Sequence, residues 1–418
     1  MSAFFAILVI FLLSLGQLQR FSLTPHLAFY WHDVAVMIFL LITTFLKRQA
    51  IIAKLTKIWQ HSHHHLPIFF TAIFIFAITI FSWIFHQISF VPILYTLRLG
   101  AYIFFVYYIF AFEILPLRQL QSALLGSLSI FLIAGFIQYF TFPDAYWLKF
   151  LGWDEHYHRL FSTLLDPNFV GIILVLPIIS ILVTQRFKVH NIIFLALFLT
   201  ALLLTYSRAS YLALITSFIL WFVQKLHQQK KFDWQKFWRP AMILTAVFVL
   251  ALVIFSTRPS THSDSTNLLR TNSIAVRAQM AFTQLQDLRG LDSLIGRGLF
   301  VALPSSTTRQ FMTQFTIVTA AFPDNLFILL ISFFGLPVTV LLLYWLVKIL
   351  RFTAKKNFTI FLMLVAVLIH SQFNNTILQP FVCLYLGLFI VMILNNSRTK
   401  RSGQKGTHVT NLGANQKS

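Results

Sequence analysis

Long apolar runs separated by short polar turns occupy most of this chain. A helix needs roughly 20 apolar residues to cross the hydrocarbon core of a bilayer, and the runs come close to that length. Membrane β-barrels show short alternating segments instead, so the runs predict helices. We therefore expect an all-α, polytopic transmembrane helical bundle of about 12 spans. The predicted spans are 2–18, 28–46, 67–87, 91–112, 121–140, 168–184, 190–206, 209–224, 240–256, 325–347, 357–375 and 380–396.

One long polar interval interrupts this pattern, at residues 257–323. A loop of that length is usually functional or disordered. Its apolar residues recur at helical spacing in two places, which predicts two amphipathic helices. The first would carry Ala278, Ala281, Phe282, Leu285 and Leu288 on one face, with Ser273 available as its cap. The second would carry Phe311, Phe315, Val318 and Phe322. We expect a long, partly helical extracytoplasmic loop that forms a small cap on the membrane surface.

The interval divides the chain into four parts. Residues 1–256 hold the first nine predicted spans, 257–323 the loop, 324–396 the last three spans, and 397–418 a polar, basic tail. We expect the tail to be disordered and in contact with acidic lipid headgroups. The first run, Met1 to Leu18, lacks the basic head of a secretory signal, so it is interpreted as a retained span.

Composition supports the membrane assignment. Hydrophobic residues make up 58% of the chain, the mean hydropathy is +0.79, and only 10% of residues are charged. Soluble domains carry about a quarter charged residues. The single cysteine, Cys383, excludes an intrachain disulfide.

The distribution of charge predicts the orientation. The formal net charge is +21, but it is not gathered as a nucleic-acid-binding surface would require. If both termini are cytoplasmic, 21 of the 32 lysines and arginines fall in short inner loops and the tail. This is the bias that the positive-inside rule describes. We therefore expect membrane lipids, and no nucleic acid, as partners of the inner face.

The basic residues left on the outer side are almost all arginines. Lys149 is the only lysine among these eleven residues, and nine of the eleven acids lie outside or in the outer halves of predicted spans. The planar guanidinium grips phosphate with two parallel hydrogen bonds, which lysine cannot do. The pattern favours phosphate binding at the outer face, although arginine simply being tolerated in translocated loops is the alternative.

Four clusters on the outer side contain residues that could carry chemistry. They are Asp154-Glu155-His156 with Arg159 and Asp166-Pro167-Asn168; Tyr206 to Ser210 around Arg208; Arg277 with Gly296-Arg297-Gly298; and Pro323-Asp324-Asn325. Arg208 either contacts a ligand or snorkels to headgroups. Asp324 is well placed to cap the tenth span, which alone would explain an aspartate there.

No metal site is expected. The outer side has no acid pair or His/Cys cluster with ligand spacing. His61, His63, His64 and His65 lie on a predicted inner loop beside lysines, where we expect them to be solvated.

The order of the outer motifs resembles a known family. Arg159 and Asp166-Pro167-Asn168 are followed by a span ending in Tyr206-Ser207-Arg208-Ala209-Ser210. The polar interval then contains Val276 to Met280 and Ile295 to Gly298, and the next span begins at Asp324-Asn325 and reaches Pro337. This arrangement resembles the bacterial O-antigen ligase and O-antigen polymerase superfamily, polytopic membrane glycosyltransferases that act on polyprenyl-diphosphate-linked glycans. The resemblance covers the whole topology and is sharpest from Arg159 to Pro337.

The resemblance implies roles for several residues. Arg208 and Arg277 correspond to arginines implicated in holding the donor's diphosphate, which they would stabilise as it leaves. Asp324 stands where ligases usually carry histidine before asparagine, as in the polymerase branch, and would accept the acceptor's proton. These three residues form the expected catalytic set. The expected substrate-binding residues are Arg159, Asn168, Arg297 and Asn325. No cofactor is implied.

The expected function is therefore transfer of a glycan from a polyprenyl diphosphate to an acceptor hydroxyl. The resemblance places this reaction at the periplasmic face of the bacterial inner membrane, in surface polysaccharide biosynthesis. Lipid A core as acceptor would indicate a ligase, a growing repeat-unit chain a polymerase, and a protein a pilin-type enzyme. The alternative is a lipid-linked glycan flippase or transporter, although the sequence has no evident internal repeat and its charges lie at one surface. A structural scaffold would explain neither the loop nor the arginines.

Overall fold

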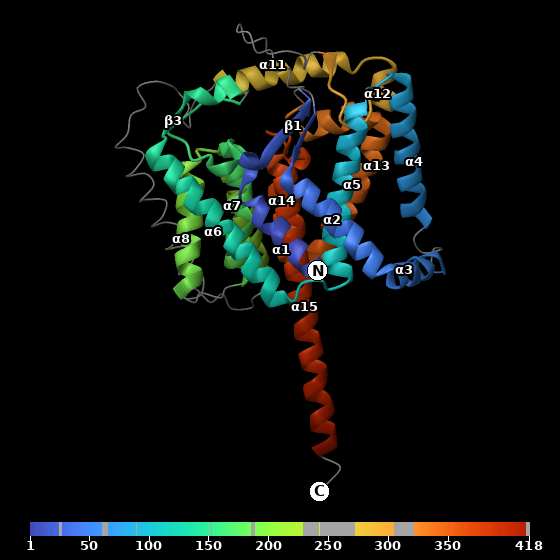
Figure 1. Cartoon of the computed structure of the whole chain (residues 1–418), viewed down its shortest axis with the longest axis vertical. Coiled ribbons are helices and arrows are strands. Elements are labelled where there is room, and N and C mark those ends of the chain that lie inside the picture. The colour runs from blue at the N-terminus through green and yellow to red at the C-terminus, as the bar shows by residue number, and fades with distance from the viewer. Residues whose placement is uncertain are drawn as a thin grey trace.

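The computed structural model describes residues 1–24, 27–60, 66–88, 90–151, 153–184, 189–228, 242, 272–304 and 322–414. These residues form a bundle that is mostly helical (Figure 1). Its first helices are α1 (Ser2–Leu13), α2 (Trp31–Leu46), α3 (Arg48–Gln60), α4 (Leu66–Phe85), α5 (Phe90–Ala111), α6 (Leu117–Thr141), α7 (Pro167–Thr184), α8 (Val189–Leu204) and α9 (Arg208–Gln228). The later helices are α11 (Asn272–Asp287), α12 (Leu291–Ile295), α13 (Leu326–Lys356), α14 (Phe358–His370) and α15 (Pro380–Ala414).

Six described helices are long and apolar enough to cross a membrane: α5, α6, α7, α9, α13 and α15. The bent pair α2 and α3 makes a seventh if it is counted as one span. The remaining apolar helices, α1, part of α4, α8 and α14, are shorter. The chain is thus a helical, multi-pass membrane protein. The twelve-span prediction is not confirmed, and the ninth predicted span, 240–256, lies outside the described residues apart from Met242.

Several predicted spans are longer than the helices that form. The first helix ends at Leu13, ahead of Gly16, which has a φ of +51° and lies against the Thr163 carbonyl with no room for a side chain. α14 ends at His370, where a short turn leads to the 3-10 helix Thr376–Leu378. Conversely α15 continues to Ala414, so the expected disorder of the tail is replaced by a helix.

α7 lies at the centre of the bundle. It is apolar all round, as a helix buried on every side must be, and it packs against α8, α9, α14 and α15. Gly171 allows α9 to approach closely, since a β-carbon there would come within 2.8 Å of the Ser210 β-carbon. This packing brings the start of α7 to the start of α9.

Two short antiparallel hairpins were not foreseen by the all-α prediction. Strands β1 (Arg20–Thr24) and β2 (Leu27–Tyr30) pair with Arg20 opposite Tyr30 and a bulge between Ser22 and Thr24. Strands β3 (Asp144–Ala145) and β4 (His156–Tyr157) form the second hairpin. Short 3-10 helices at Gly16–Gln19, Tyr146–Leu151 and Ser162–Leu164 complete these connections.

The described part of the polar loop, 272–304, contains a long helix and a short one. α11 lies across the upper end of the bundle in Figure 1 and corresponds to the first predicted amphipathic helix. Its described part begins at Asn272, and the side chain of Ser273, the predicted cap, lies outside the part that the structure describes. Of the second predicted helix, Phe311, Phe315 and Val318 lie outside the described residues.

The segment after α12 packs into a break in α13. Gly335 interrupts the helix with a φ of +74°, and Pro337 cannot donate to the Phe333 carbonyl. The Gly298 amide donates to that carbonyl at 3.1 Å, and the Arg297 amide donates to the Ser332 carbonyl at 2.7 Å. The loop thus satisfies backbone groups that a bilayer could not.

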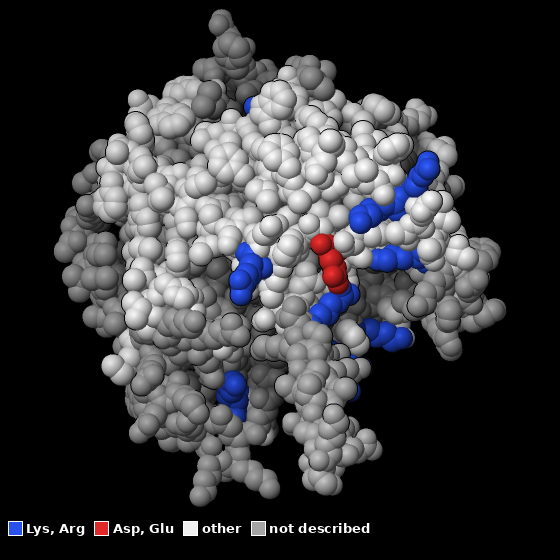
Figure 2. Space-filling model, turned by 60° about the horizontal axis from the view of Figure 1, so that its bottom comes forward, with Lys and Arg blue, Asp and Glu red and all other residues white. Residues whose placement is uncertain are grey.

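The lower end of the bundle in Figure 1 carries both chain termini, opposite α11. Figure 2 turns this end forward and shows lysines and arginines spread over it, with little acidic surface. One acid, Glu113, follows α5 and accepts from Arg398 of α15 at 3.2 Å. α11 and the basic end therefore lie at opposite ends of the molecule.

Candidate functional site

Arg277 and Asp324 come together at the end of the bundle that carries α11. Arg277 lies in the second turn of α11 and Asp324 two residues before α13. The Arg277 Nε lies 3.9 Å from an Asp324 carboxylate oxygen. Arg277 also donates to the Phe373 carbonyl at 2.6 Å and to the Asn374 side-chain oxygen at 3.4 Å. Both charged side chains remain partly exposed, so the pair is open to a ligand.

Asn325, and not Asp324, caps α13. Its side-chain oxygen accepts from the amides of Phe327 at 3.0 Å and Ile328 at 3.3 Å. The expectation that Asp324 caps the tenth span is therefore wrong by one residue. The two neighbours divide the tasks, because the asparagine satisfies the amides of the first turn and leaves the carboxylate to face Arg277. Asn325 also donates to Gln372, at 3.4 Å.

Arg208 forms the other side of this cluster. It is the first residue of α9 and lies close enough to Arg277 for the two positive charges to repel each other. His370, at the end of α14, is fully buried and also feels the charge of Arg277. Its Nδ1 lies 2.6 Å from the Thr376 hydroxyl, and its ring lies near the main chain of Asn168. A concentration of positive charge among polar groups favours an anionic ligand.

Arg159 is deeply buried beneath the cluster, where it bonds to neighbouring segments of the chain. Its Nε donates to the Thr205 carbonyl at 2.9 Å, and a terminal nitrogen lies 3.5 Å from the Asn168 side-chain oxygen. The Arg159 carbonyl accepts from Gln138 of α6 at 3.2 Å. These bonds connect α6, α7 and the α8–α9 turn. The predicted substrate-binding pair Arg159 and Asn168 therefore forms the base of the cluster.

Asp166 shapes the same base. Its carboxylate accepts from the Asn168 amide at 2.7 Å at the start of α7. Burial raises the pKa of Asp166 to about 6, although the amides and Arg159 act in the opposite direction. The charged form of a carboxyl shielded from water is penalised by desolvation, so this acid loses its proton at a higher pH than an ordinary aspartate does.

Arg297 occupies different surroundings from the other predicted residues. Its guanidinium donates to Asp292 of α12 at 2.9 Å, and the other Asp292 oxygen lies 3.2 Å from His86 after α4. The main chain beside it is fixed to α13 and α4, where the Ser82 hydroxyl donates to the Gly296 carbonyl at 2.7 Å. Through these contacts, Arg297 helps to fix the segment after α12 against α13 and α4.

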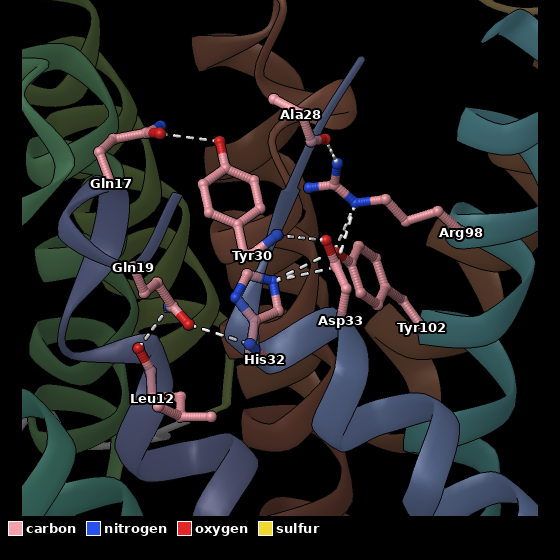
Figure 3. A network of polar contacts seen from close by, with 9 residues as sticks. All are labelled: Leu12, Gln17, Gln19, Ala28, Tyr30, His32, Asp33, Arg98 and Tyr102. Carbon is pink, nitrogen blue, oxygen red and sulfur yellow. Dashed lines mark hydrogen bonds and ion pairs between the residues drawn. The ribbon is translucent and has the colours of Figure 1, made fainter. Parts of the chain in front are cut away.

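A second polar network lies beneath the β1–β2 hairpin and was not predicted (Figure 3). Asp33 of α2 pairs with Arg98 of α5 at 3.2 Å and accepts from the Tyr30 amide at 2.8 Å and from the Tyr102 hydroxyl. Arg98 donates to the Tyr102 hydroxyl at 2.7 Å and lies over the Tyr30 ring. The sequence feature that could have predicted this network is an arginine and an aspartate in two separate apolar runs, because charged residues within the membrane normally pair with one another.

Asn374 and the carbonyl of Phe373, which hold Arg277, were also not predicted. They lie in the turn after α14, inside the predicted span 357–375, where an apolar pattern gives no sign of a chain reversal. No group of three or more metal-ligating side chains occurs in the described part of the chain. The four histidines at 61 and 63–65 lie outside it.

Comparison with models of protein families, with curated proteins and with solved structures gives no match.

Proposed function

We propose that this protein is a membrane glycosyltransferase of the O-antigen ligase or polymerase type. It would move a glycan from a polyprenyl-diphosphate carrier to an acceptor hydroxyl, at the periplasmic face of the bacterial inner membrane. The observation that carries the proposal is the cluster at the α11 end. There Arg277 and Asp324, 47 positions apart, form an open ion pair beside Arg208.

The two arginines would bind the donor's diphosphate. An anion between two like charges is attracted by both, and a diphosphate offers oxygens for both guanidinium groups. The phosphate would compete with Asp324 for Arg277 at the ion pair, whose atoms are 3.9 Å apart. As the bond from the anomeric carbon to the diphosphate oxygen breaks, the electron pair stays on the diphosphate. The arginines would stabilise that growing charge.

Asp324 would act as the base. With the donor bound to Arg277, the partly exposed carboxylate would accept a hydrogen bond from the acceptor hydroxyl. The hydroxyl oxygen attacks the anomeric carbon, and its proton passes to the carboxylate. Product release returns the proton to solvent and the ion pair reforms. No metal or cofactor takes part in this scheme.

The basic end of the molecule supports the orientation. Lysines and arginines outnumber acids on the end opposite α11 (Figure 2), and the positive-inside rule assigns such an end to the cytoplasm. Reporter fusions after Ser260 and after Ser402 are expected to report opposite sides of the membrane. Agreement between the two reporters would reject the topology and, with it, a periplasmic site.

The alternative is a lipid-linked glycan flippase or other transporter. Two observations favour it, namely the break in α13 at Gly335 and the buried Arg98–Asp33 pair. Broken helices and buried charges are common in transporters. The discriminating result is chemical, since only a transferase forms a glycosidic bond in detergent solution, without a membrane to cross.

The main test is glycan transfer by purified Asp324→Asn protein. An amide cannot accept the proton, and loss of a general base typically costs about 10²–10⁴-fold in rate. Glu155→Gln is the matched control, an exposed acid of the β3–β4 hairpin that contacts Tyr157 at 3.1 Å. Asp324→His is expected to retain some activity, because imidazole is a base near neutral pH. Transfer by Asp324→Asn at the wild-type rate would move the search for a base to Asp166 or His370.

Arg277→Lys tests the diphosphate contact separately. Lysine keeps the charge but loses the two-pronged grip, so expression should persist while transfer falls. Full activity of both Arg277→Lys and Arg208→Lys would show that the guanidinium geometry is not needed.

A deletion strain distinguishes a ligase from a polymerase by its surface polysaccharide. Long chains retained on the lipid carrier indicate a ligase, and core bearing one repeat unit indicates a polymerase.

A further inference from the structure

The corner where α2, α3 and α5 meet has a sharply defined shape. α2 ends at Leu46 and α3 begins at Arg48, and the axes of the two helices differ by 81°. If α2 crosses the bilayer, such a bend turns α3 toward the plane of the membrane surface. Lys47 and Arg48 occupy the bend itself, and both are exposed. This corner belongs to the basic end of the molecule, opposite α11 (Figure 1).

The polar groups of the corner match a phospholipid headgroup. Neither Lys47 nor Arg48 forms an ion pair with a described acidic residue, so their charge is available to a phosphate. Beside them an exposed hydrogen bond joins the Thr44 hydroxyl of α2 to the Tyr108 hydroxyl of α5, at 3.2 Å. Two hydroxyls and two cations provide donors for a phosphodiester and for a polar headgroup.

Lys54 closes the other side of the corner. Its ammonium group lies 4.6 Å from the centre of the Phe112 ring and donates to the Ala111 carbonyl at the end of α5. These two contacts fix α3 against the end of α5 and so hold the angle between α2 and α3. The Tyr108 and Phe112 rings also contact each other, at 5.3 Å. Aromatic side chains at this level are typical of the membrane–water interface.

The apolar surface above the corner matches the acyl chains. Leu41 and Phe45 lie one turn apart on α2, and Phe104 lies one turn from Tyr108 on α5. All three side chains are more than half exposed. Water would make this surface costly, whereas hydrocarbon would not. The exposed stripe leads from the hydroxyl pair into the apolar zone, as the chains of a bound lipid would.

We propose that this corner is a binding site for an acidic phospholipid of the inner leaflet. Its phosphate contacts Lys47 and Arg48, its headgroup contacts the Thr44 and Tyr108 hydroxyls, and its chains lie along α2 and α5. The site is separate from the Arg277–Asp324 cluster and does not depend on glycan transfer. It differs from the diffuse charge of the basic face because hydroxyl, aromatic and apolar groups converge on two cations.

The test is saturable binding of dioctanoyl phosphatidylglycerol to the full-length protein in detergent, followed by native mass spectrometry. Dioctanoyl phosphatidylcholine and glycerol 3-phosphate serve as comparison ligands. The double variant Lys47→Gln/Arg48→Gln is compared with Lys355→Gln/Lys356→Gln, which removes two cations at the end of α13. Each basic residue near an acidic surface strengthens binding about fivefold, so the first variant should lose about 25-fold in affinity and the second little.

Tyr108→Phe refines the result. It removes the hydroxyl and keeps the ring, so a smaller loss of affinity than in the double variant is expected. Equal losses in the two double variants would overturn the proposal in favour of diffuse surface charge. Equal binding of phosphatidylcholine would exclude selection for an acidic headgroup, and equal binding of glycerol 3-phosphate would exclude a lipid site. All of these measurements remain informative if the protein proves not to be a transferase.

Discussion

Two arginine–aspartate pairs in this molecule have the same chemistry and opposite surroundings. Arg98 and Asp33 lie 3.2 Å apart, with side-chain exposures of 11% and 8% (Figure 3). Arg277 and Asp324 lie 3.9 Å apart, with exposures of 42% and 46%. The first pair is surrounded by tyrosines and backbone groups. The second lies at the end of the bundle that carries α11.

The difference indicates which pair can exchange partners. Asp33 already accepts from Arg98, Tyr102 and the Tyr30 amide, and Arg98 is covered by aromatic rings. A buried charge that lost such partners would carry its full desolvation cost. Arg277 and Asp324 have water as an alternative partner, so a ligand can displace one from the other at small cost. We infer that the closed pair maintains the fold and the open pair binds ligand.

The largest expected effect comes from breaking the closed pair. Arg98→Met leaves Asp33 buried without its cation, which typically costs about 3–5 kcal/mol. We expect a large fall in the thermal unfolding temperature of the purified protein in detergent. Arg98→Met combined with Asp33→Asn should recover most of that loss, since asparagine still accepts from the Tyr30 amide.

The recovery is what separates a charge effect from simple loss of packing. If the double variant is as unstable as Arg98→Met, the arginine acts through its contacts with the Tyr30 and Tyr102 rings. If Arg98→Met is as stable as wild type, the network does not maintain the fold, and the contrast between the two pairs fails.

A smaller effect is expected at Asp166, below the open pair. Its folded pKa of about 6 exceeds the ordinary value of 3.8, so the folded state holds the proton more tightly. Stability is therefore highest below about pH 4 and falls as the pH rises through 6, by up to about 3 kcal/mol. Asp166→Asn keeps the acceptor for the Asn168 amide and cannot ionise. It should unfold at a higher temperature than wild type at pH 8 and at a similar one at pH 4.

The neighbours Asp324 and Asn325 provide a matched comparison of intermediate size. Asn325→Ala removes the cap of α13 and should cost about 1 kcal/mol of stability. Asp324→Ala should cost less, because its carboxylate does not cap the helix. The measurement is the unfolding temperature of both variants in one detergent. The reverse order would restore Asp324 as the principal cap.

The sequence predicted the membrane architecture better than its details. Eleven of the predicted apolar runs each overlap a described helix, because hydrophobicity and length suffice to locate them approximately. It could not reveal that α1 stops before Gly16 or that α13 breaks at Gly335. Both features depend on distant segments, Thr163 and Leu294, that leave no room for a β-carbon. The hairpins were missed because their strands are only two to five residues long.

For the candidate site, the sequence proposed residues and could not supply their contacts. Outer-side charge clusters, read together with the family resemblance, proposed Arg208, Arg277 and Asp324. In the structure Arg277 lies 3.9 Å from Asp324, and its charge acts on Arg208. The cap was assigned one residue too early, since aspartate and asparagine cap almost equally well. Arg297, like Arg277, is an arginine of the polar loop and was predicted to bind substrate. Its guanidinium instead pairs with Asp292, only five residues away, and this local ion pair explains its position. The turn after α14, which holds Arg277, has no signal in an apolar pattern.

The smallest effect on stability is expected at the open pair, together with a large effect on function. Half-exposed ion pairs contribute about 0–1 kcal/mol, so Arg277→Gln should unfold within a few degrees of wild type. Glycan transfer should nevertheless fall about 10²–10³-fold if the guanidinium stabilises the leaving diphosphate. Arg289→Gln, an exposed arginine two residues beyond α11, is the matched control and should change neither property. A strongly destabilised Arg277→Gln protein would show that its bonds to Phe373 and Asn374 maintain the fold. The two pairs would then differ only in how deeply they are buried. The Arg277–Asp324 pair would no longer stand out as the pair that can exchange a protein partner for a ligand.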